Sequence, residues 1–335
     1  MEDLARGTPR KSQGSARDIP GGAHNVDLVA MGAALSNWGR WGADDELGCV
    51  NFITRESRRA ASSLIREGKT FSLALSLDRE GPQPSTERRL NPQHVMLQTG
   101  TELRAGVQRG AMNGWGYADD MVIMALQCGT HWDALAHAFY DYKMYNNRDC
   151  TLVGVDGALK NDISVLRDAV AGRAVLCDVA ATLGVPALDP DHRITVDDLE
   201  RTLAAQAVTV RPGDILLIRT GHLGRIRATG SWDGLTYSDE PGIGLDALPW
   251  VHEHRIAALA ADNWAFEVLP SGNGIMLPVH AVGIVHMGLL LGELFDLDAL
   301  AEDCRRDGIF EMLVVAPPLP FSRAVGSPIN PIAMK

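Results

Sequence analysis

Residues 127–137 read QCGTHWDALAH and directly follow an apolar run, Met121–Leu126. We expect this run to form a buried strand, because it contains no charged residue and lies between Asp119-Asp120 and Cys128-Gly129. The glycine at 129 permits a backbone turn that other residues resist. The stretch therefore predicts a turn after a strand, with several polar side chains just beyond it.

Three of these polar side chains are of types that bind metal ions. His131 and Asp133 are two residues apart, so in extended backbone both point to one side. An imidazole and a carboxylate on one side form a half-site for Zn²⁺ or Mn²⁺. His137 lies four residues after Asp133, so a helical turn would return it to the same region. Gln127 lies four residues before His131 and could join the site through its amide oxygen. The spacing alone fits a loop with simply hydrogen-bonded histidines as well as it fits a metal site.

Outward from this stretch, the chain alternates between helix and strand patterns. We expect helices at Thr54–Gly68, Thr195–Gln206, Leu245–Glu253 and Leu297–Arg306. We expect further strands at Phe71–Leu77, Ala174–Val179, Asp214–Ile218, Ile256–Ala260 and Phe310–Val315, while His280–Leu291 mixes both signals. Thr195 and Asp198 form a capping-box pattern. This alternation predicts an α/β fold.

Composition excludes several classes of protein. The 335 residues allow one or two domains, and the net charge of −11 argues against nucleic acid as a partner. The five cysteines are widely spaced and form no CxxC, as is typical of free thiols in a cytoplasmic protein. The most apolar later stretch, Leu277–Leu291, is shorter than a membrane span, so we expect no membrane segment. Residues 1–25 are rich in Gly, Ser, Pro and charge, which predicts a disordered tail.

The central stretch resembles the HxGTHxDxPxH signature of the putative cyclase family, which includes bacterial kynurenine formamidase and isatin hydrolase. The agreement covers Gly129, Thr130, His131, Asp133 and His137, whereas Gln127 replaces the first His and Leu135 replaces the Pro. Other segments are similar too: Asn37–Gly42, Gly213-Asp214, Arg219–Gly221, Ala261–Asn263, His280 and Glu293. The resemblance implies a single α/β domain of the swivelling β/β/α cyclase type over residues 26–335.

The resemblance also assigns roles at the site. It implies that His131 and Asp133 bind a divalent metal ion and that His137 is the catalytic acid or base. His280 and Glu293 would complete a second metal position or the polar surroundings of the first. Because Gln127 offers a neutral amide in place of an imidazole, we expect one ion, Zn²⁺ or Mn²⁺, with Gln127 as a ligand or a neighbour of the ligands. Family members commonly associate, so a homo-oligomer is expected by analogy.

Four more residues are candidates for contact with a small-molecule substrate. Arg219 and Thr220 are candidates to hold a substrate carboxylate, although Arg219 is equally a candidate for a structural ion pair. Trp132 is either a pocket wall or part of the core. His222 follows a predicted strand end, from which it could line the pocket.

The resemblance implies a metal-dependent hydrolase that cleaves an amide, lactam or lactone bond of a small aromatic or cyclic substrate. A bound ion would lower the pKa of its water toward about 7 and polarise a carbonyl. His137 would take the proton of that water and pass it to the leaving group. Two alternatives remain open: a cyclase or lyase that uses the ion as a Lewis acid, and a metal-containing binding protein without turnover.

Overall fold

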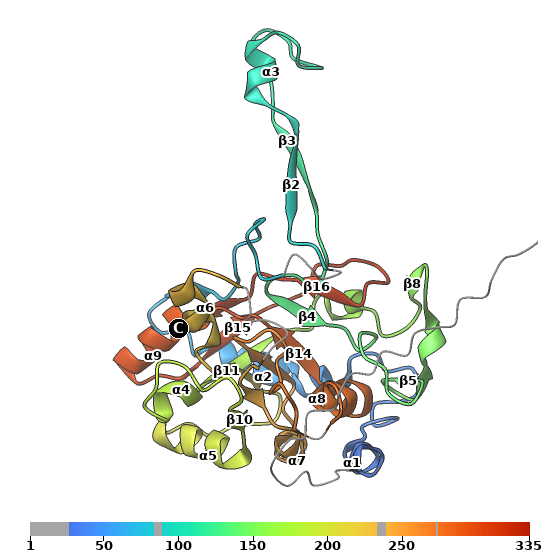
Figure 1. The fold of residues 1–335 in the computed structure, drawn as a ribbon, viewed down its shortest axis with the longest axis vertical. Helices are drawn as coiled ribbons and strands as arrows, with labels where there is room; N and C mark the ends of the chain where they lie inside the picture. Colours follow the sequence, from blue (N-terminus) through green and yellow to red (C-terminus); the bar gives the residue numbers. More distant parts are fainter. Residues whose placement is uncertain (1–26, 84–88, 233–238, 273) are drawn as a thin grey trace, which may run out of the picture.

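A nine-stranded sheet organises the chain in the computed structural model, which describes residues 27–83, 89–232, 239–272 and 274–335 (Figure 1). The expected disordered tail, residues 1–25, lies outside these ranges. The strands of the sheet are β1 Thr70–Ser72, β4 His131–Asp133, β9 Ala171–Asp178, β11 Ile215–Arg219, β13 Ala258–Ala261, β14 Leu290–Glu293, β15 Glu311–Val315, β16 Gly326–Pro328 and β17 Ile332–Met334. Their order is β1-β17-β15-β9-β11-β13-β14-β4-β16. The central strands β9, β11, β13 and β14 are parallel, and the other pairs are antiparallel.

Shorter strand pairs and helices surround this sheet. The pairs are β2 Gln93–Gln98 with β3 Asp119–Ile123, β5 Lys143–Met144 with β6 Arg148–Asp149, β7 Val153–Gly154 with β8 Gly157–Ala158, and β10 Arg193–Ile194 with β12 Gly242–Ile243. The α-helices are α1 Leu28–Leu35, α2 Arg55–Ser62, α3 Gly100–Arg104, α4 Val179–Thr182, α5 Val196–Ala205, α6 His222–Thr229, α7 Leu248–Glu253, α8 Pro278–His280 and α9 Asp298–Asp307. A π-helix, Ala281–Met287, continues α8. None of the helices in the described ranges is long and apolar enough to cross a membrane.

The sheet curls until its two ends approach each other. β16 is last in the strand order and β17 is second, yet only residues 329–331 separate them in the chain. An extended connection of that length spans at most about 14 Å, whereas the two strands would lie about 34 Å apart in a flat sheet. The segment after β1 bridges the two ends, because Leu73 N–H donates to Pro331 O and Leu75 N–H donates to Thr130 Oγ1. The curl brings β16 and β17 within reach of one short connection.

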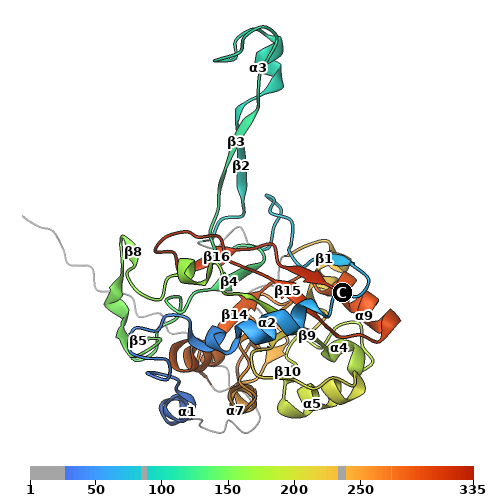
Figure 2. The same ribbon diagram turned by 180° about the vertical axis from the view of Figure 1, so that it is seen from behind.

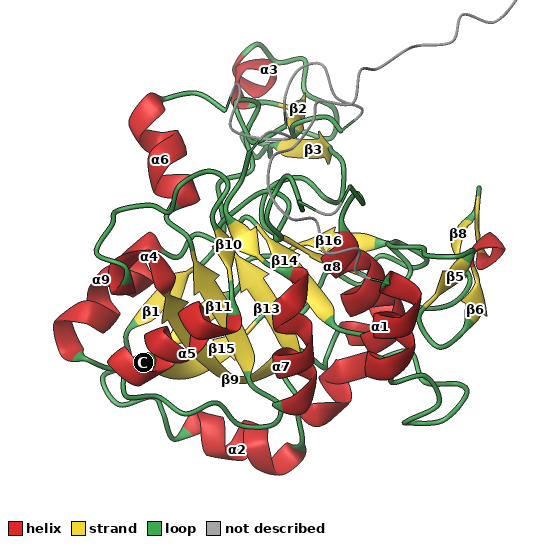
Figure 3. Cartoon of the chain, turned by 60° about the horizontal axis from the view of Figure 1, so that its bottom comes forward, coloured by secondary structure: helices red, strands yellow, loops and turns green. Residues whose placement is uncertain are grey.

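The side chains of the parallel strands are almost entirely buried, and helices surround the sheet that these strands form (Figure 3). In β11, Ile215 and Leu217 belong to one apolar cluster, whereas Leu216 and Ile218 belong to the other. Side chains of α5 and α7 pack in the second cluster, and side chains of α9 pack in the first. Burial on both faces explains why these strands read as continuous apolar runs in the sequence.

The mixed α/β architecture agrees with the sequence-based prediction. Four expected strands form as β9, β11, β13 and β15, and two expected helices form as α5 and α9. The capping box is present: Thr195 Oγ1 accepts from the backbone N–H of Asp198, and the Asp198 carboxylate accepts from that of Thr195. All five cysteines are free.

Several predicted boundaries were wrong. The helix expected to Gly68 ends at Ser62, whose hydroxyl donates to Arg59 O and so competes with the helical hydrogen bonds. The strand expected at Phe71–Leu77 ends at Ser72, because the following residues cross between the two ends of the sheet. The helix expected at Leu245–Glu253 divides into a 3₁₀ turn and α7, with Pro249 in the first turn of α7.

The apolar run Met121–Leu126 was also wrongly predicted to be buried. Its first residues lie in β3, which pairs with β2 in a hairpin that projects from the body and has α3 at its tip (Figures 1 and 2). Every residue of β3 is exposed. We call residues 89–123 the arm. The sequence shows that this strand is apolar, but it does not show what the strand packs against.

The close pairing of β14 with β4 generates a stability prediction. Gly292 lies opposite Trp132, and a Cβ at 292 would stand 2.5 Å from the Trp132 ring and 2.6 Å from the Phe295 ring. We expect Gly292→Ala to lower the free energy of unfolding by about 1–3 kcal/mol, because both rings would have to shift. Urea denaturation measures the change.

The matched control is Gly154→Ala, where an added Cβ meets nothing within 4 Å. That control should stay within about 0.5 kcal/mol of the unmodified chain. Equal stabilities of the two variants would contradict the packing argument.

Candidate metal centre

The short strand β4 places the two central side chains of the site. His131 and Asp133 alternate with Trp132, so both point to one face of the sheet while Trp132 points to the other. His131 Nδ1 lies 2.9 Å from Gly129 O, which fixes the ring with Nδ1–H as donor. The free Nε2 of His131 therefore faces Asp133, at 3.5 Å from Oδ1.

Glu293 joins them from the neighbouring strand. β14 pairs with β4 so that Glu293 stands directly opposite His131, and residues opposite each other in an antiparallel pair share a face. Glu293 Oε2 lies 3.4 Å from His131 Nε2. The pairing register alone thus brings the late glutamate of the sequence to the central motif.

His280 completes the group from α8. Its Nε2 lies 3.6 Å from Asp133 Oδ2 and 3.4 Å from Glu293 Oε1. Its Nδ1 lies 2.6 Å from Glu267 Oε1, and the same Glu267 carboxylate accepts the backbone N–H groups of Val279 and His280. Glu267 therefore fixes both the start of α8 and the orientation of the His280 ring. We call His131, Asp133, His280 and Glu293 the cluster.

His137 stands at the open side of the cluster. A turn closed by His137 N–H to Ala134 O returns it toward Asp133, with Nε2 3.7 Å from Asp133 Oδ1. Its side chain is 23% exposed, whereas the four side chains of the cluster are at most 7% exposed. A molecule from solvent would thus meet His137 first.

The distances within the cluster fit a shared cation better than hydrogen bonds. Separations of 3.4–3.6 Å are too long for good hydrogen bonds, and no hydrogen-bond partner is found among the described residues for His131 Nε2 or either Asp133 oxygen. Two atoms bound to one Zn²⁺ at about 2.1 Å in a tetrahedral arrangement lie about 3.4 Å apart. The ligand atoms of His131, Asp133 and Glu293 all lie within 4.8 Å of one another. These residues fit the divalent ion that the family resemblance implies.

The electrostatics of the site lead to the same conclusion. Burial disfavours the charged forms of His131 and His280, but attraction to Asp133, Glu293 and, for His280, Glu267 outweighs it and raises both pKa values. Burial likewise disfavours charge on Asp133, but His137, His131 and His280 hold its pKa well below the usual range. The carboxylates thus attract positive charge, which bound metal or protons can supply.

His137 behaves differently from the cluster histidines. Burial lowers its pKa and outweighs the opposing attraction of Asp133. Its imidazole is therefore neutral at neutral pH and able to accept a proton.

Gln127 lies on the same side of the sheet as Asp133. A Cβ on Gly326 would stand 2.4 Å from Gln127 Nε2, and Gly326 pairs directly with Asp133 in β16 and β4. Within the described residues, Gln127 Nε2 has no hydrogen-bond partner. Its role, as ligand or as neighbour of the ligands, stays a prediction.

Trp132 belongs to the core rather than to a pocket wall. It is fully buried, its indole N–H donates to Ala316 O, and its ring packs against Phe295 at a centroid distance of 5.0 Å. The alternation of side chains along β4 explains the correction, since the residue between two ligands must face the opposite side.

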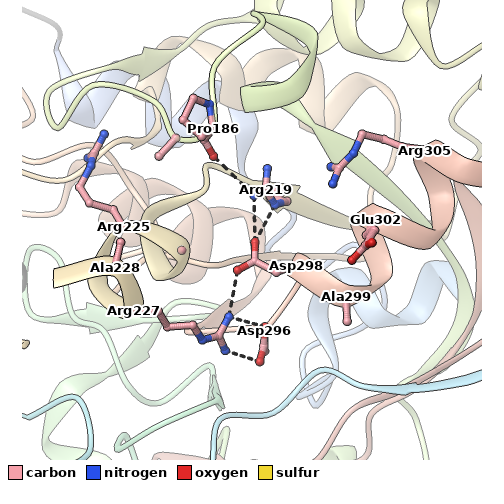
Figure 4. Close-up of a pocket in the computed structure, with 12 residues that line it drawn as sticks. Pro186, Arg219, Arg225, Arg227, Ala228, Asp296, Asp298, Ala299, Glu302 and Arg305 are labelled. Atoms are coloured by element: carbon pink, nitrogen blue, oxygen red, sulfur yellow. Dashed lines mark hydrogen bonds and ion pairs between the residues drawn. The ribbon is translucent and has the colours of Figure 1, made fainter. Parts of the chain in front are cut away.

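Arg219 is held by ion pairs (Figure 4). Its guanidinium lies 3.0 Å from Asp178 and 2.9 Å from Asp298, and it lines a cavity of about 660 Å³ between α6 and α9. None of the residues that line this cavity belongs to the cluster. The structure thus favours the ion-pair alternative over a clamp for a substrate carboxylate.

Thr220 and His222 also serve the fold at this end of the sheet. Thr220 Oγ1 donates to Asp262 Oδ1 at 2.7 Å, and the backbone N–H groups of Thr220 and Gly221 donate to the same carboxylate. His222 is fully buried as the first residue of α6. Contact of Thr220 or His222 with substrate stays a prediction.

Glu267 is the functional candidate that the sequence reasoning missed. It is a lone acidic residue in the apolar stretch Trp264–Leu269, and it is 1% exposed. A carboxylate in such a stretch is a signal, because a buried charge requires partners.

Comparisons with solved structures show the fold and the family. A structure described as a novel cyclase is 39% identical, covers 91% of this chain and 99% of its own, and superposes with a TM-score of 0.84. Isatin hydrolase A from Ralstonia solanacearum is 17% identical, with a TM-score of 0.59 and coverage of 84% and 98%. Isatin hydrolase A from Labrenzia aggregata, bound to benzyl benzoate, is 15% identical, with a TM-score of 0.56 and coverage of 82% and 94%. At 15–17% identity, the likeness to the isatin hydrolases shows a common fold.

No protein of curated function matches the sequence significantly. The family model for putative cyclases matches residues 71–268, which is more than half of the chain. This match confirms the resemblance seen in the central motif, and it agrees with the 39% identity to the cyclase structure. The chain therefore belongs to the putative cyclase family.

Proposed function

We propose that this protein is a metal-dependent hydrolase that cleaves an amide, lactam or lactone bond of a small aromatic or cyclic substrate. The observation that carries the proposal is the cluster itself. Two imidazoles and two carboxylates from three separate elements converge at 3.4–3.6 Å without hydrogen bonds between them, beside a partly exposed histidine. Such a donor set suits one Zn²⁺ or Mn²⁺ ion.

The residues of the cluster would hold the ion in a preformed arrangement. His131 and His280 each donate Nδ1–H to a fixed acceptor, which leaves both Nε2 lone pairs directed at Asp133 and Glu293. Asp133 and Glu293 supply the negative charge that a divalent ion requires. When bound, such an ion supplies Lewis acidity, which lowers the pKa of a water molecule and polarises a carbonyl.

His137 would transfer the proton during the reaction. Its low pKa keeps Nε2 available as a base at neutral pH. The imidazole would accept a proton from the attacking water and then donate it to the leaving nitrogen or oxygen. Asp133 Oδ1, 3.7 Å from Nε2, would stabilise the imidazolium that forms between these events.

The substrate class rests on the family and on access. The isatin hydrolases share this fold, and residues 127–137 resemble the signature of the family that includes kynurenine formamidase and isatin hydrolase. A small substrate is favoured, because the side chains of the cluster are almost fully buried and only His137 beside them is partly exposed.

Metal content tests the proposed ligands. We expect purified protein to contain about one divalent ion per chain, and we expect His131→Ala and Asp133→Asn to lose it, because each removes a buried donor. Elemental mass spectrometry measures the metal, and circular dichroism checks that the variants remain folded. His252→Ala, a histidine outside the cluster, should keep the ion. Folded variants that bind metal as tightly as the unmodified chain would refute the ligand assignment.

Catalysis tests the role of His137. We expect His137→Gln to keep its metal but to lose about 10²- to 10⁴-fold in kcat, the usual contribution of a general acid-base group. The assay uses a panel of N-formyl aromatic amines, isatins and lactones in ¹⁸O-labelled water. Hydrolysis must place the label in the product. Turnover without incorporation of label would favour a cyclase or lyase and overturn the hydrolase proposal.

The positioning role of Glu267 can be separated from stability. We expect Glu267→Gln to weaken metal binding by about 10- to 100-fold, because the amide holds the His280 ring less strongly than the carboxylate does. Competition with a chromogenic chelator measures the affinity, and thermal unfolding of the metal-free protein measures stability. Glu253→Gln, an exposed glutamate of α7, is the control. Unchanged metal affinity would show that Glu267 acts only as a cap of α8.

A further inference from the structure

Arg89, the first residue of the arm, is held beside the candidate metal centre. Its guanidinium donates to Gln127 O at 3.3 Å, and Gln127 begins the central motif that carries His131 and Asp133. The arm leaves the body above β4, the strand of the two proposed ligands, in both views (Figures 1 and 2). The contact with Gln127 therefore places a permanently positive side chain next to the segment that leads into the cluster.

A second contact joins Arg89 to the segment that carries Glu267. The guanidinium carbon Cζ lies 5.4 Å from the centroid of the Trp264 ring, within the range of a cation–π contact. Trp264 lies three residues before Glu267 in the same irregular segment. It also packs in one apolar cluster with Leu294, which directly follows the proposed ligand Glu293. Arg89 thus contacts two separate segments, both of which continue into residues of the site.

The positive charge of Arg89 has no anionic partner among the residues that the structure describes. Its hydrogen bond there is to Gln127 O, and no acidic side chain of the described ranges forms an ion pair with it. Arg219, by contrast, lies between two carboxylates. A guanidinium has five N–H donors, so most of those of Arg89 stay available to a ligand. Because Arg89 is only partly buried, a molecule from solvent can reach it.

The charge of Arg89 also acts on His137. Burial is the main reason that the pKa of His137 is low, and repulsion from the positive charge of Arg89 contributes to it. Such repulsion weakens with distance, which indicates that the two side chains lie within reach of one small molecule. His137 is the partly exposed side chain of the site. A ligand that meets His137 from solvent would therefore come close to Arg89 as well.

We propose that Arg89 binds a carboxylate of the substrate and so selects aromatic substrates that carry a carboxylate next to the bond to be cleaved. A planar guanidinium donates in its own plane, so the Trp264 ring can cover one face while the N–H edge makes a two-point contact with a planar carboxylate. This inference rests on the proposed function and narrows its substrate class. It gives Arg89 the role for which Arg219 was a candidate in the sequence.

Two substrates that differ only in a carboxylate test the proposal: N-formylanthranilate, which carries it, and formanilide, which lacks it. We expect Arg89→Met to lower kcat/KM for N-formylanthranilate by about 10- to 100-fold and to leave that for formanilide within about 3-fold, because only the first loses a charged hydrogen-bonded contact. Arg89→Lys should recover part of the loss, since it keeps the charge but not the fork. Arg59→Met, at an exposed arginine of α2, is the control.

The comparison separates substrate selection from a structural role. A residue that only supports the fold would affect both substrates alike when it is replaced. Equal losses on the two substrates, or no loss on either, would therefore overturn the proposal.

Binding without turnover separates this proposal from the hydrolase proposal. Isothermal titration of the purified protein with benzoate and with benzamide measures the contact directly. We expect Arg89→Met to weaken benzoate binding by about 10- to 100-fold and to leave benzamide binding unchanged. That result in a chain that cleaves neither formamide would support the carboxylate site while contradicting the hydrolase function. Benzoate that binds both chains equally, or does not bind the unmodified chain, would overturn the carboxylate site even in an active hydrolase.

Discussion

The antiparallel pairing of β4 with β14 is the constraint on which the site depends. β4 is only three residues long, yet it carries two proposed ligands on one face and a core tryptophan on the other. Its register against β14 sets Glu293 opposite His131 and Gly292 opposite Trp132. Thr130 fixes this register further, because its hydroxyl donates to Leu294 O and accepts from Leu75 N–H. A shift by one residue would exchange ligand and core faces together.

The cluster and the neighbouring Glu267 bring several carboxylates together where solvent cannot screen their charge. Asp133, Glu293 and Glu267 are each at most 7% exposed, and burying a carboxylate without compensation is costly. Two arrangements offset this cost. Glu267 accepts hydrogen bonds from two backbone N–H groups and one imidazole, while Asp133 and Glu293 face a common centre. The first arrangement is complete within the protein, whereas the second would be completed by the proposed cation. This difference separates the positioning carboxylate from the proposed ligands.

The sequence predicted the local parts of the site better than the long-range ones. The two-residue spacing of His131 and Asp133 is a property of strand geometry, so it could be interpreted without a fold. The approach of His280 and Glu293 to the motif came from the family resemblance. In the structure, the sheet register explains the position of Glu293, and the contacts with Glu267 explain that of His280. Glu267 was missed because its partner is 13 residues away through an irregular segment. For a related reason, the structure does not favour the predicted substrate contact of Arg219 and contradicts the predicted burial of Met121–Leu126. A sequence shows that a residue is charged or apolar, but it does not show which residues it will contact in the fold.

The curl of the sheet also bears on the order in which the chain folds. β4 is held on one side by β14 and on the other by β16, and Asp133 pairs with Gly326 from the far end of the chain. Contacts between such distant segments form slowly, because long loops must close first, whereas β9, β11 and β13 lie closer in sequence. We therefore expect the parallel core to assemble before the edge that carries β4. The mutually repelling carboxylates would then meet only in the last stage of folding, when a rigid scaffold is already present to hold them.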